Sequence, residues 1–308
     1  MADAQTLLPL FSIAMRTVSD CPACGASNPT NVAQLDGRSR QAFLEYDQLK
    51  YGGLLSGWID IVPPEILACR ACGHAWYRNQ PDPEQLAIMY ASGRPLLNLP
   101  HPQSNALTSA MQEEMRRLRH LVGIEGQQPS LLDFGSGHGH WARAAVLEGF
   151  KVVAYEPSVA RGNENNPPFK LVHSEDELNG SRFDVINLEQ VLEHVPDPNK
   201  ILLNIRSYCN DATIVRITVP NILRCEERKD IWRLWPFDGH RTHVMAPFEH
   251  LHGFTPSSLV NLIKRSGYEL VPLKKTWRNY LIFSLRNLAA KLYPKVAQTI
   301  VLVKLKKN

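Results

Sequence analysis

Short apolar runs that alternate with helical periods from residue 130 onward constrain the fold more than any other feature. The runs are SLLDF, KVVAYE, FKLVH, FDVINLE, TIVRITVP, YELVPL and TIVLVKL. Such alternation is typical of a parallel sheet with crossover helices. We therefore predict an α/β fold with seven strands for residues 130–308. A helix with Leu281, Leu285, Leu288 and Leu292 on one face separates the last two strands, so that these strands can pair at the sheet edge.

The sequence before residue 96 has a different character, because turns dominate it. In the segment NQPDPEQLAIMYAS, Asp82 is expected to cap a short helix that begins at Pro83. A linker rich in Pro and Asn follows. Residues 105–122 carry apolar side chains at three- and four-residue spacing, which predicts an amphipathic helix. The predicted organisation is an N-terminal domain over residues 1–95, a linker and helix over 96–129, and the α/β domain over 130–308.

Two Cys-x-x-Cys pairs lie in the predicted N-terminal domain, and each is followed by glycine, as CPACG and CRACG. Each pair places two thiolates on a tight turn, and two such turns complete a tetrahedral zinc site. Disulfides or free thiols are the alternative, which two matched pairs disfavour. The predicted ligands of a structural Zn²⁺ are Cys21, Cys24, Cys69 and Cys72. The interval of 44 residues leaves room for a hairpin or helix around Phe43 to Trp58, and Cys209 and Cys225 are expected to be ordinary thiols.

The segment LLDFGSGHG places three glycines at alternate positions between an apolar strand and the helical stretch HWARAAVLEG. Glycine lets the backbone turn sharply and lets a ligand approach closely. The spacing of Gly135, Gly137 and Gly139 departs from the G-x-G-x-x-G of dinucleotide sites, which disfavours NAD. At the end of the next strand, Glu156 can accept hydrogen bonds from both hydroxyls of an adenosine ribose. The alternative is a plain tight turn beside a surface carboxylate, but the joint occurrence of all these features favours a binding site.

Together, LLDFGSGHG, the acidic end of KVVAYE and the later FDVINLEQVLEHVPDP resemble class I S-adenosylmethionine-dependent methyltransferases over residues 130–308. The resemblance implies a Rossmann-like seven-stranded sheet whose last strand is antiparallel, with the cofactor across the carboxyl ends of the first strands. Glu156 would hold the ribose, and Glu175 or Asp176 would approach the adenine amine. The full set of cofactor-binding residues that follows is Asp133, Gly135, Ser136, Gly137, Gly139, Glu156, Glu175, Asp176 and Glu189.

The cysteine pairs are also similar to the N-terminal zinc-binding domain of bacterial methyltransferases that act on nucleotide-linked deoxysugars, including sugar C-methyltransferases. Those C-methyltransferases carry a Glu-His pair shortly before an F-[ST]-x-x-[SL] stretch, and here Glu249-His250 precedes Phe254-Thr255. A second family histidine follows strand four and matches His194 in LEHVPD. The resemblance thus implies His250 as the catalytic base, Glu249 as the residue that orients it, and His194 as a helper.

Histidines are dense in the segment DGHRTHVMAPFEHLHGFT, which holds His240, His243, His250 and His252 among the eleven of the chain. H-x-x-H and H-x-H spacings make a second metal site conceivable, but Asp238 and Glu249 are the only acidic residues nearby. Catalytic or substrate-binding use is favoured. For His194 the alternative is structural, since Glu193 to Pro196 can close a turn before Asp197 caps the next helix. Trp232, Trp235 and Phe237 form a candidate lid or substrate wall.

The formal net charge of +4 comes from the end of the chain. From Lys274 onward there are nine Lys or Arg residues and no Asp or Glu, so residues 1–273 carry a net −5. A basic run of this kind is more often a solvated helix face than a nucleic-acid or membrane contact. No uninterrupted apolar stretch has the length of a membrane span, and no signal peptide is recognised. We expect a cytoplasmic protein for which nucleic acid is a disfavoured partner.

These features predict an enzyme that transfers a methyl group from S-adenosylmethionine to a small hydroxylated metabolite, either a sugar nucleotide or a natural-product intermediate. A histidine would assist removal of the acceptor proton. The alternatives are a non-catalytic zinc- and nucleotide-binding module, which the intact glycines and Glu156 disfavour, and a methyltransferase of RNA or protein that docks through the cysteine domain. The methylated atom, whether oxygen, nitrogen or carbon, stays open.

Overall fold

The computed structural model describes residues 14–35, 37–92, 105–123, 126–159, 166–223, 244–271 and 298–306. Several sequence predictions therefore lie outside the described residues. They are the helix that carries Leu281 to Leu292, the histidines His240 and His243, the aromatic residues Trp232, Trp235 and Phe237, the acidic residue Asp238 and the thiol of Cys225.

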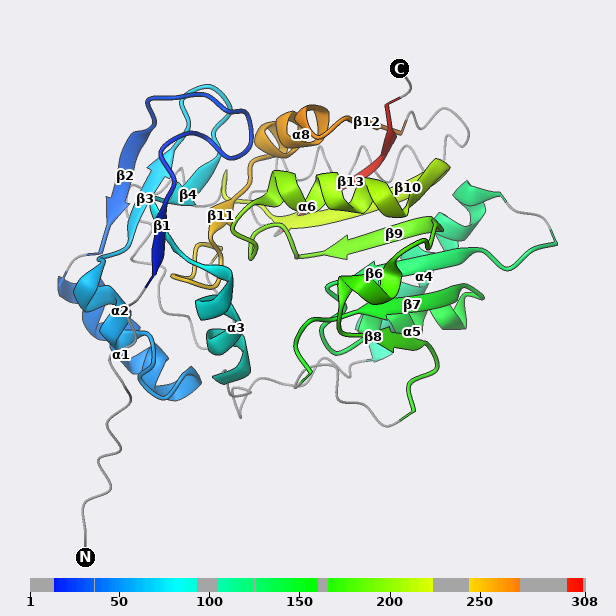
Figure 1. Cartoon of the computed structure of the whole chain (residues 1–308), viewed down its shortest axis with the longest axis horizontal. Coiled ribbons are helices and arrows are strands. Elements are labelled where there is room, and N and C mark those ends of the chain that lie inside the picture. Colours follow the sequence, from blue (N-terminus) through cyan, green and yellow to red (C-terminus); the bar gives the residue numbers. More distant parts are fainter. Residues whose placement is uncertain are drawn as a thin grey trace, which may run out of the picture.

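A seven-stranded sheet forms the centre of the molecule (Figure 1). Its strands run in the order β12, β13, β10, β9, β6, β7, β8. Strand β13 is antiparallel to both of its neighbours, while β10, β9, β6, β7 and β8 are parallel to one another. The bounds are Ser130–Phe134 for β6, Lys151–Tyr155 for β7, Lys170–Val172 for β8, Phe183–Glu189 for β9, Cys209–Pro220 for β10, Tyr268–Leu270 for β12 and Gln298–Leu305 for β13. All seven predicted strands are present, so the predicted fold class is confirmed.

Helices cover both faces of this sheet, because alternate residues of each strand point to opposite sides. Leu131 of β6 belongs to a buried cluster with residues of α4 (Asn105–Val122) and α5 (His140–Leu147). Leu132 belongs to another cluster with residues of α6 (Pro198–Ile205) and α8 (Pro256–Arg265). The predicted amphipathic helix is α4. None of the helices within the described residues combines the length and apolar character of a membrane span.

The N-terminal region is small and built around turns. It contains β1 (Met15–Thr17), β2 (Thr30–Gln34), α1 (Gly37–Lys50), α2 (Ser56–Ile61), β3 (Glu65–Ala68), β4 (Ala75–Tyr77), β5 (Asn79–Pro81) and α3 (Pro83–Ser92). Between the two cysteine pairs, helices α1 and α2 lie between the paired strands β2 and β3, so the stretch from Phe43 to Trp58 is mainly helical, which is one of the two predicted options. The carboxylate of Asp82 accepts a hydrogen bond from the backbone N–H of Gln85 at 2.9 Å, as expected of the cap of α3.

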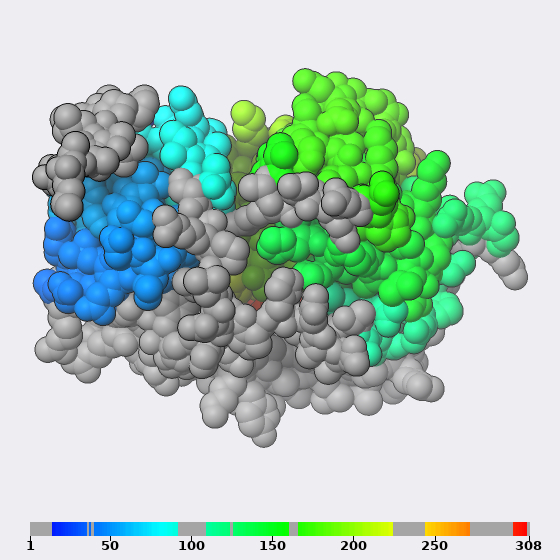
Figure 2. Space-filling view, turned by 90° about the horizontal axis from the view of Figure 1, so that it is seen from below, coloured from blue at the N-terminus to red at the C-terminus, as the bar shows by residue number. Residues whose placement is uncertain are grey.

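One strand of the N-terminal sheet comes from the far end of the chain. Strand β11 (His252–Gly253) pairs antiparallel with β4 and completes a four-stranded sheet in the order β11, β4, β3, β2. Trp76 of β4 is fully buried in the same apolar cluster as Leu259 and Leu262 of α8. In Figure 2 the cyan residues of the N-terminal region lie between its blue residues and the green residues of the large sheet.

Candidate active site

The glycine loop after β6 uses a backbone conformation that only glycine adopts without strain. Gly135, Gly137 and Gly139 have φ of 75°, 54° and 71°. A Cβ on Gly135 would lie 2.8 Å from Val191, and one on Gly139 would lie 2.7 Å from Phe169. A Cβ on Gly137 meets no described atom within 4 Å. The outer two glycines are therefore required by packing, whereas the central one leaves the loop open to a ligand.

Glu156 holds this loop in place from the end of β7. Its carboxylate accepts hydrogen bonds from the backbone N–H of Gly137 at 2.8 Å and of Ser158 at 3.0 Å. Among the described residues, the buried hydroxyl oxygens of Ser136 and Ser158 find no hydrogen-bond partner. Buried polar atoms without a partner are rare in folded proteins. The loop and the end of β7 therefore present unsatisfied polar groups and spare carboxylate lone pairs, which fit a hydroxyl-rich ligand such as a nucleoside.

A row of polar side chains crosses the centre of the sheet beside the loop. Asp133, Asn187 and Arg216 are direct neighbours in the register of β6, β9 and β10. The Asn187 amide donates to Asp133 Oδ1 at 2.8 Å, and Arg216 donates to Asn187 Oδ1 at 2.8 Å. Asp133 Oδ2 is buried without a partner among the described residues, and burial raises the pKa of Asp133 to about 7. The row thus ends in a carboxylate that can still receive a polar ligand.

Arg216 is buried, and its charge is compensated on two sides. It donates to Glu189 at 2.6 Å and to Glu114 of α4 at 3.1 Å, and its guanidinium lies 4.2 Å from the centroid of the Trp141 ring. Sequence reasoning missed both Asn187 and Arg216. The available signal was a polar residue with apolar neighbours on both sides in the middle of a strand, in FDVINLE and TIVRITVP.

Glu189 and the residues after β8 are found at the carboxyl ends of the parallel strands. The Glu189 carboxylate accepts from Arg216 and, at 2.6 Å, from the Thr218 hydroxyl. Glu175 and Asp176 begin the short 3₁₀ helix Glu175–Leu178, which directly follows the third strand and is capped by Ser174. The phenol of Tyr208 donates to Glu175 at 3.4 Å. Their contact with an adenine stays a prediction.

Two of the predicted catalytic residues, His194 and His250, lie side by side. The rings of His194 and His250 lie edge to face, with centroids 4.5 Å apart. His194 Nδ1 is 2.8 Å from the Glu249 carbonyl oxygen and 2.9 Å from the Tyr90 hydroxyl, and His250 Nδ1 is 3.3 Å from the Val244 carbonyl oxygen. Burial lowers the pKa of His250, so its imidazole is neutral at pH 7. The His250 imidazole is therefore held in a basic, uncharged form.

The Glu249 carboxylate turns toward α1. It accepts from Lys50 Nζ at 2.7 and 2.8 Å and from the Tyr46 hydroxyl. Burial opposes ionisation of Glu249, but the Lys50 ammonium prevails and holds the pKa of this carboxyl below its ordinary value. Glu249 thus contacts His194 through its backbone carbonyl and the N-terminal region through its carboxylate. Sequence reasoning missed Tyr46, Lys50 and Tyr90, because nothing local marks residues about a hundred or more positions away.

His252 does not join His250. It lies in β11, where its ring stacks on that of His74, with 3.3 Å between His252 Nδ1 and His74 Nε2. Both rings are fully buried, and burial lowers the pKa of His252 to about 4. The H-x-H spacing of His250 and His252 thus places the two imidazoles in different surroundings.

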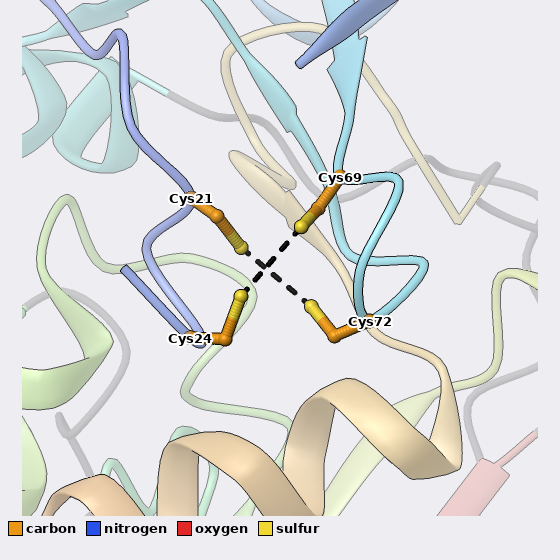
Figure 3. Close-up of side chains that lie close together, drawn as sticks. All are labelled: Cys21, Cys24, Cys69 and Cys72. Carbon is orange, nitrogen blue, oxygen red and sulfur yellow. Dashed lines mark hydrogen bonds between the residues drawn. The ribbon is translucent and has the colours of Figure 1, made fainter. Parts of the chain in front are cut away.

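The four cysteines of the two Cys-x-x-Cys pairs converge on one point (Figure 3). The sulfur of Cys21 is 3.6 Å from that of Cys72, and the sulfur of Cys24 is 3.6 Å from that of Cys69. All four are free thiols, and their sulfurs lie within 4.8 Å of one another. A tetrahedral site with Zn–S bonds of about 2.3 Å needs sulfurs about 3.8 Å apart. The donor set and its spacing therefore fit a zinc ion, and the fifth described cysteine, Cys209, lies elsewhere in the core.

Comparison with known families identifies the class of protein that this fold and site define. A family model described as "Methyltransferase domain" matches residues 107–273, which is more than half of the chain. The chain belongs to this methyltransferase family. The family match and the glycine loop after β6 together identify it as an S-adenosylmethionine-dependent methyltransferase. Among curated proteins, none matches the sequence.

Solved structures of other methyltransferases resemble the chain at low sequence identity. One is the 1,6-didemethyltoxoflavin-N1-methyltransferase of Burkholderia thailandensis, with 18% identity, coverage of 79% of this chain and 96% of that one, and a TM-score of 0.45. Another is the plantazolicin methyltransferase BpumL, with 14% identity, coverage of 67% and 91%, and a TM-score of 0.43. A third is a methyltransferase of Mesorhizobium loti, with 16% identity, coverage of 61% and 95%, and a TM-score of 0.41.

Proposed function

We propose that this enzyme methylates a small hydroxylated metabolite, either a sugar nucleotide or a natural-product intermediate, and that His250 removes the acceptor proton. The observation that carries the proposal is the position of His194 and His250 next to the glycine loop. Val191 packs against Gly135, and the N–H of His194 donates to the Val191 carbonyl at 3.0 Å. One turn of chain thus joins the glycine loop to the two imidazoles. Because the His250 ring is buried, a small acceptor is favoured over a nucleic acid or a protein.

The loop and the strand ends supply groups for each part of the cofactor. When bound, S-adenosylmethionine supplies an electrophilic methyl group on a sulfonium sulfur. We assign Asp133, Ser136 and the three glycines to its methionine end, and Glu156 to the ribose hydroxyls. Glu175 or Asp176 is assigned to the adenine amine. We assign Glu189 a supporting role, since its carboxylate compensates the buried Arg216 that orients the row ending at Asp133.

His250 is suited to accept a proton from a hydroxyl. Its Nδ1 is occupied by the Val244 carbonyl, so Nε2 carries the lone pair. The negative charge of the nearby Glu249 favours the protonated ring once the proton has been taken up. His194 packs edge-on against His250 and keeps its orientation. In this scheme the carboxylate charge of Glu249 stabilises the protonated His250 ring, and the backbone carbonyl of Glu249 orients His194 through its Nδ1.

The same proposal includes a structural zinc ion on Cys21, Cys24, Cys69 and Cys72. Four thiolates complete the coordination of zinc and leave no position for a substrate. A metal binds cysteines as thiolates, so zinc binding would release the protons of the four thiols. The site lies in the core, where it joins the Cys-x-x-Cys turns to α8.

Titration of the zinc-loaded protein with S-adenosylmethionine tests the proposal, and saturable binding of one molecule per chain is the expected result. Replacement of Glu156 by Ala should weaken this binding about 100-fold, because charge-assisted hydrogen bonds of about 1.5 to 3 kcal/mol each are lost. Calorimetry measures the affinity, and Glu84→Ala, at an exposed position of α3, is the matched control. An absence of binding by the folded zinc protein would end the proposal and favour a non-catalytic zinc module.

The pKa of Asp133 predicts a pH dependence of cofactor binding. Below about pH 7 the buried carboxyl is mostly protonated, and above it the carboxylate attracts the ammonium group of the methionine moiety. The affinity for S-adenosylmethionine should therefore rise as the pH increases through about 7. Asp133→Asn should bind weakly at every pH, whereas Asp211→Asn, at an exposed carboxylate, should keep the wild-type profile. A flat profile in the wild type would exclude Asp133 from contact with the ammonium.

A further inference from the structure

Glu193 is a buried carboxylate whose surroundings do not satisfy it. The residue has no exposed surface, and neither carboxylate oxygen finds a hydrogen-bond partner among the described residues. An unpaired buried carboxylate costs several kcal/mol, so native proteins pair it or let it coordinate a metal. A positively charged partner at this position would remove the cost.

Two imidazoles face the same point as the Glu193 carboxylate. His194 Nε2 lies 4.0 Å from Glu193 Oε1, and one ligand atom each of Glu193, His194 and His250 lies within 4.8 Å of the others. In both histidines Nδ1 lies within hydrogen-bond distance of a backbone carbonyl, that of Glu249 or Val244. A carbonyl at Nδ1 fixes the tautomer in which Nε2 has the lone pair, and this is the usual arrangement of histidines that bind a metal.

We propose that Glu193, His194 and His250 form a binding site for a divalent first-row transition-metal ion. Two imidazoles and one carboxylate are ligands that such ions accept, and three protein ligands leave coordination positions open. Mg²⁺ and Ca²⁺ prefer ligand sets made of oxygen and are disfavoured here. The site is distinct from the cysteine cluster, whose thiolates select zinc. In the proposed site the ion lies between Glu193 and His194, which follow β9, and His250, which precedes β11.

The open coordination positions would serve to deprotonate the acceptor hydroxyl. On this point the inference rests on the proposed function. A cation there would bind the acceptor hydroxyl, favour breaking of its O–H bond and leave the electron pair on oxygen while the proton passes to solvent. The Nε2 of His250 is then a ligand, so the cation replaces His250 as the means of deprotonation. Dependence of turnover on the cation separates the two roles.

Titration of the zinc-loaded protein with Mn²⁺, followed by the loss of the EPR signal of the free ion, tests the site. Mn²⁺ is the appropriate probe because it competes poorly with zinc for thiolates. The expected result is one Mn²⁺ per chain in the wild type, with affinity at least about 10- to 100-fold weaker in Glu193→Gln. His120→Gln, at an exposed position near the end of α4, should bind like the wild type. Thermal unfolding verifies that each variant is folded, and His194→Asn replaces Glu193→Gln if the latter does not fold.

The inference is overturned if the folded wild type shows no saturable Mn²⁺ binding at millimolar concentration, or if Glu193→Gln and His194→Asn bind with unchanged affinity. These outcomes are independent of the proposed function, because S-adenosylmethionine binding is measured without Mn²⁺. Cofactor binding and turnover without any added cation, in a protein that does not bind Mn²⁺, would leave His250 as the base. Mn²⁺ binding without cofactor binding would support the metal site and remove the proposed function.

Discussion

Replacement of Cys72 by Ser is expected to destabilise the whole chain and not only the N-terminal region. Structural zinc contributes about 10 to 16 kcal/mol of apparent binding free energy, whereas a domain is stable by only about 5 to 15 kcal/mol. Cys72 belongs to the same buried cluster as Leu259 and Leu262 of α8, and the Thr255 hydroxyl donates to the Cys72 carbonyl at 3.0 Å. Loss of the proposed metal would therefore remove a support for α8, which packs in the same buried cluster as strands of the large sheet.

Zinc content and circular dichroism during thermal unfolding measure this effect. Cys72→Ser should contain little zinc and should unfold at a much lower temperature or be recovered unfolded. A strong chelator should lower the midpoint of the wild type in the same way. Cys209→Ala is the matched control, because Cys209 is also buried, at the start of β10, but is not one of the four converging thiols. A Cys72→Ser protein with wild-type stability would show that the four thiols need no metal.

Replacement of His250 by Ala is expected to lower turnover about 10²- to 10⁴-fold, the range for loss of a general base. Cofactor affinity should change little, because the Glu156 carboxylate bonds to Gly137 and Ser158, whereas His250 Nδ1 bonds to the Val244 carbonyl. Burial lowers the pKa of His250, so the base is neutral at pH 7. Wild-type turnover should therefore be constant around neutrality and should fall only when the pH drops below the ordinary range of histidine.

Release of S-adenosylhomocysteine with a panel of hydroxylated sugar nucleotides measures turnover. His250→Asn, which keeps most of the side-chain volume, separates a catalytic loss from a packing defect, and calorimetry with S-adenosylmethionine verifies that each variant is folded. His120→Ala should retain full activity, since His120 is exposed. Equal turnover by His250→Asn and the wild type on an accepted substrate would discard the role of base.

Features that depend on neighbouring residues could be predicted from the sequence. The seven strands and the helices α3, α4 and α5 follow from apolar periodicity and capping, which act within one element. The glycine loop was also predictable, because a positive φ at Gly135, Gly137 and Gly139 is a local requirement. The two cysteine pairs predicted their own convergence, since two such turns offer matched halves of a tetrahedron.

The sequence by itself thus determined the class of fold, the cofactor loop and the four thiols, whereas the tertiary structure decided the rest of the site. Asn187 and Arg216 become neighbours of Asp133 only through the register of three strands, which no single strand encodes. Tyr90 reaches His194, Lys50 reaches Glu249 and β11 joins β4 only because two regions pack together. The physical reason is that packing, register and burial depend on residues far apart in the chain, whereas periodicity and turn geometry depend on adjacent ones.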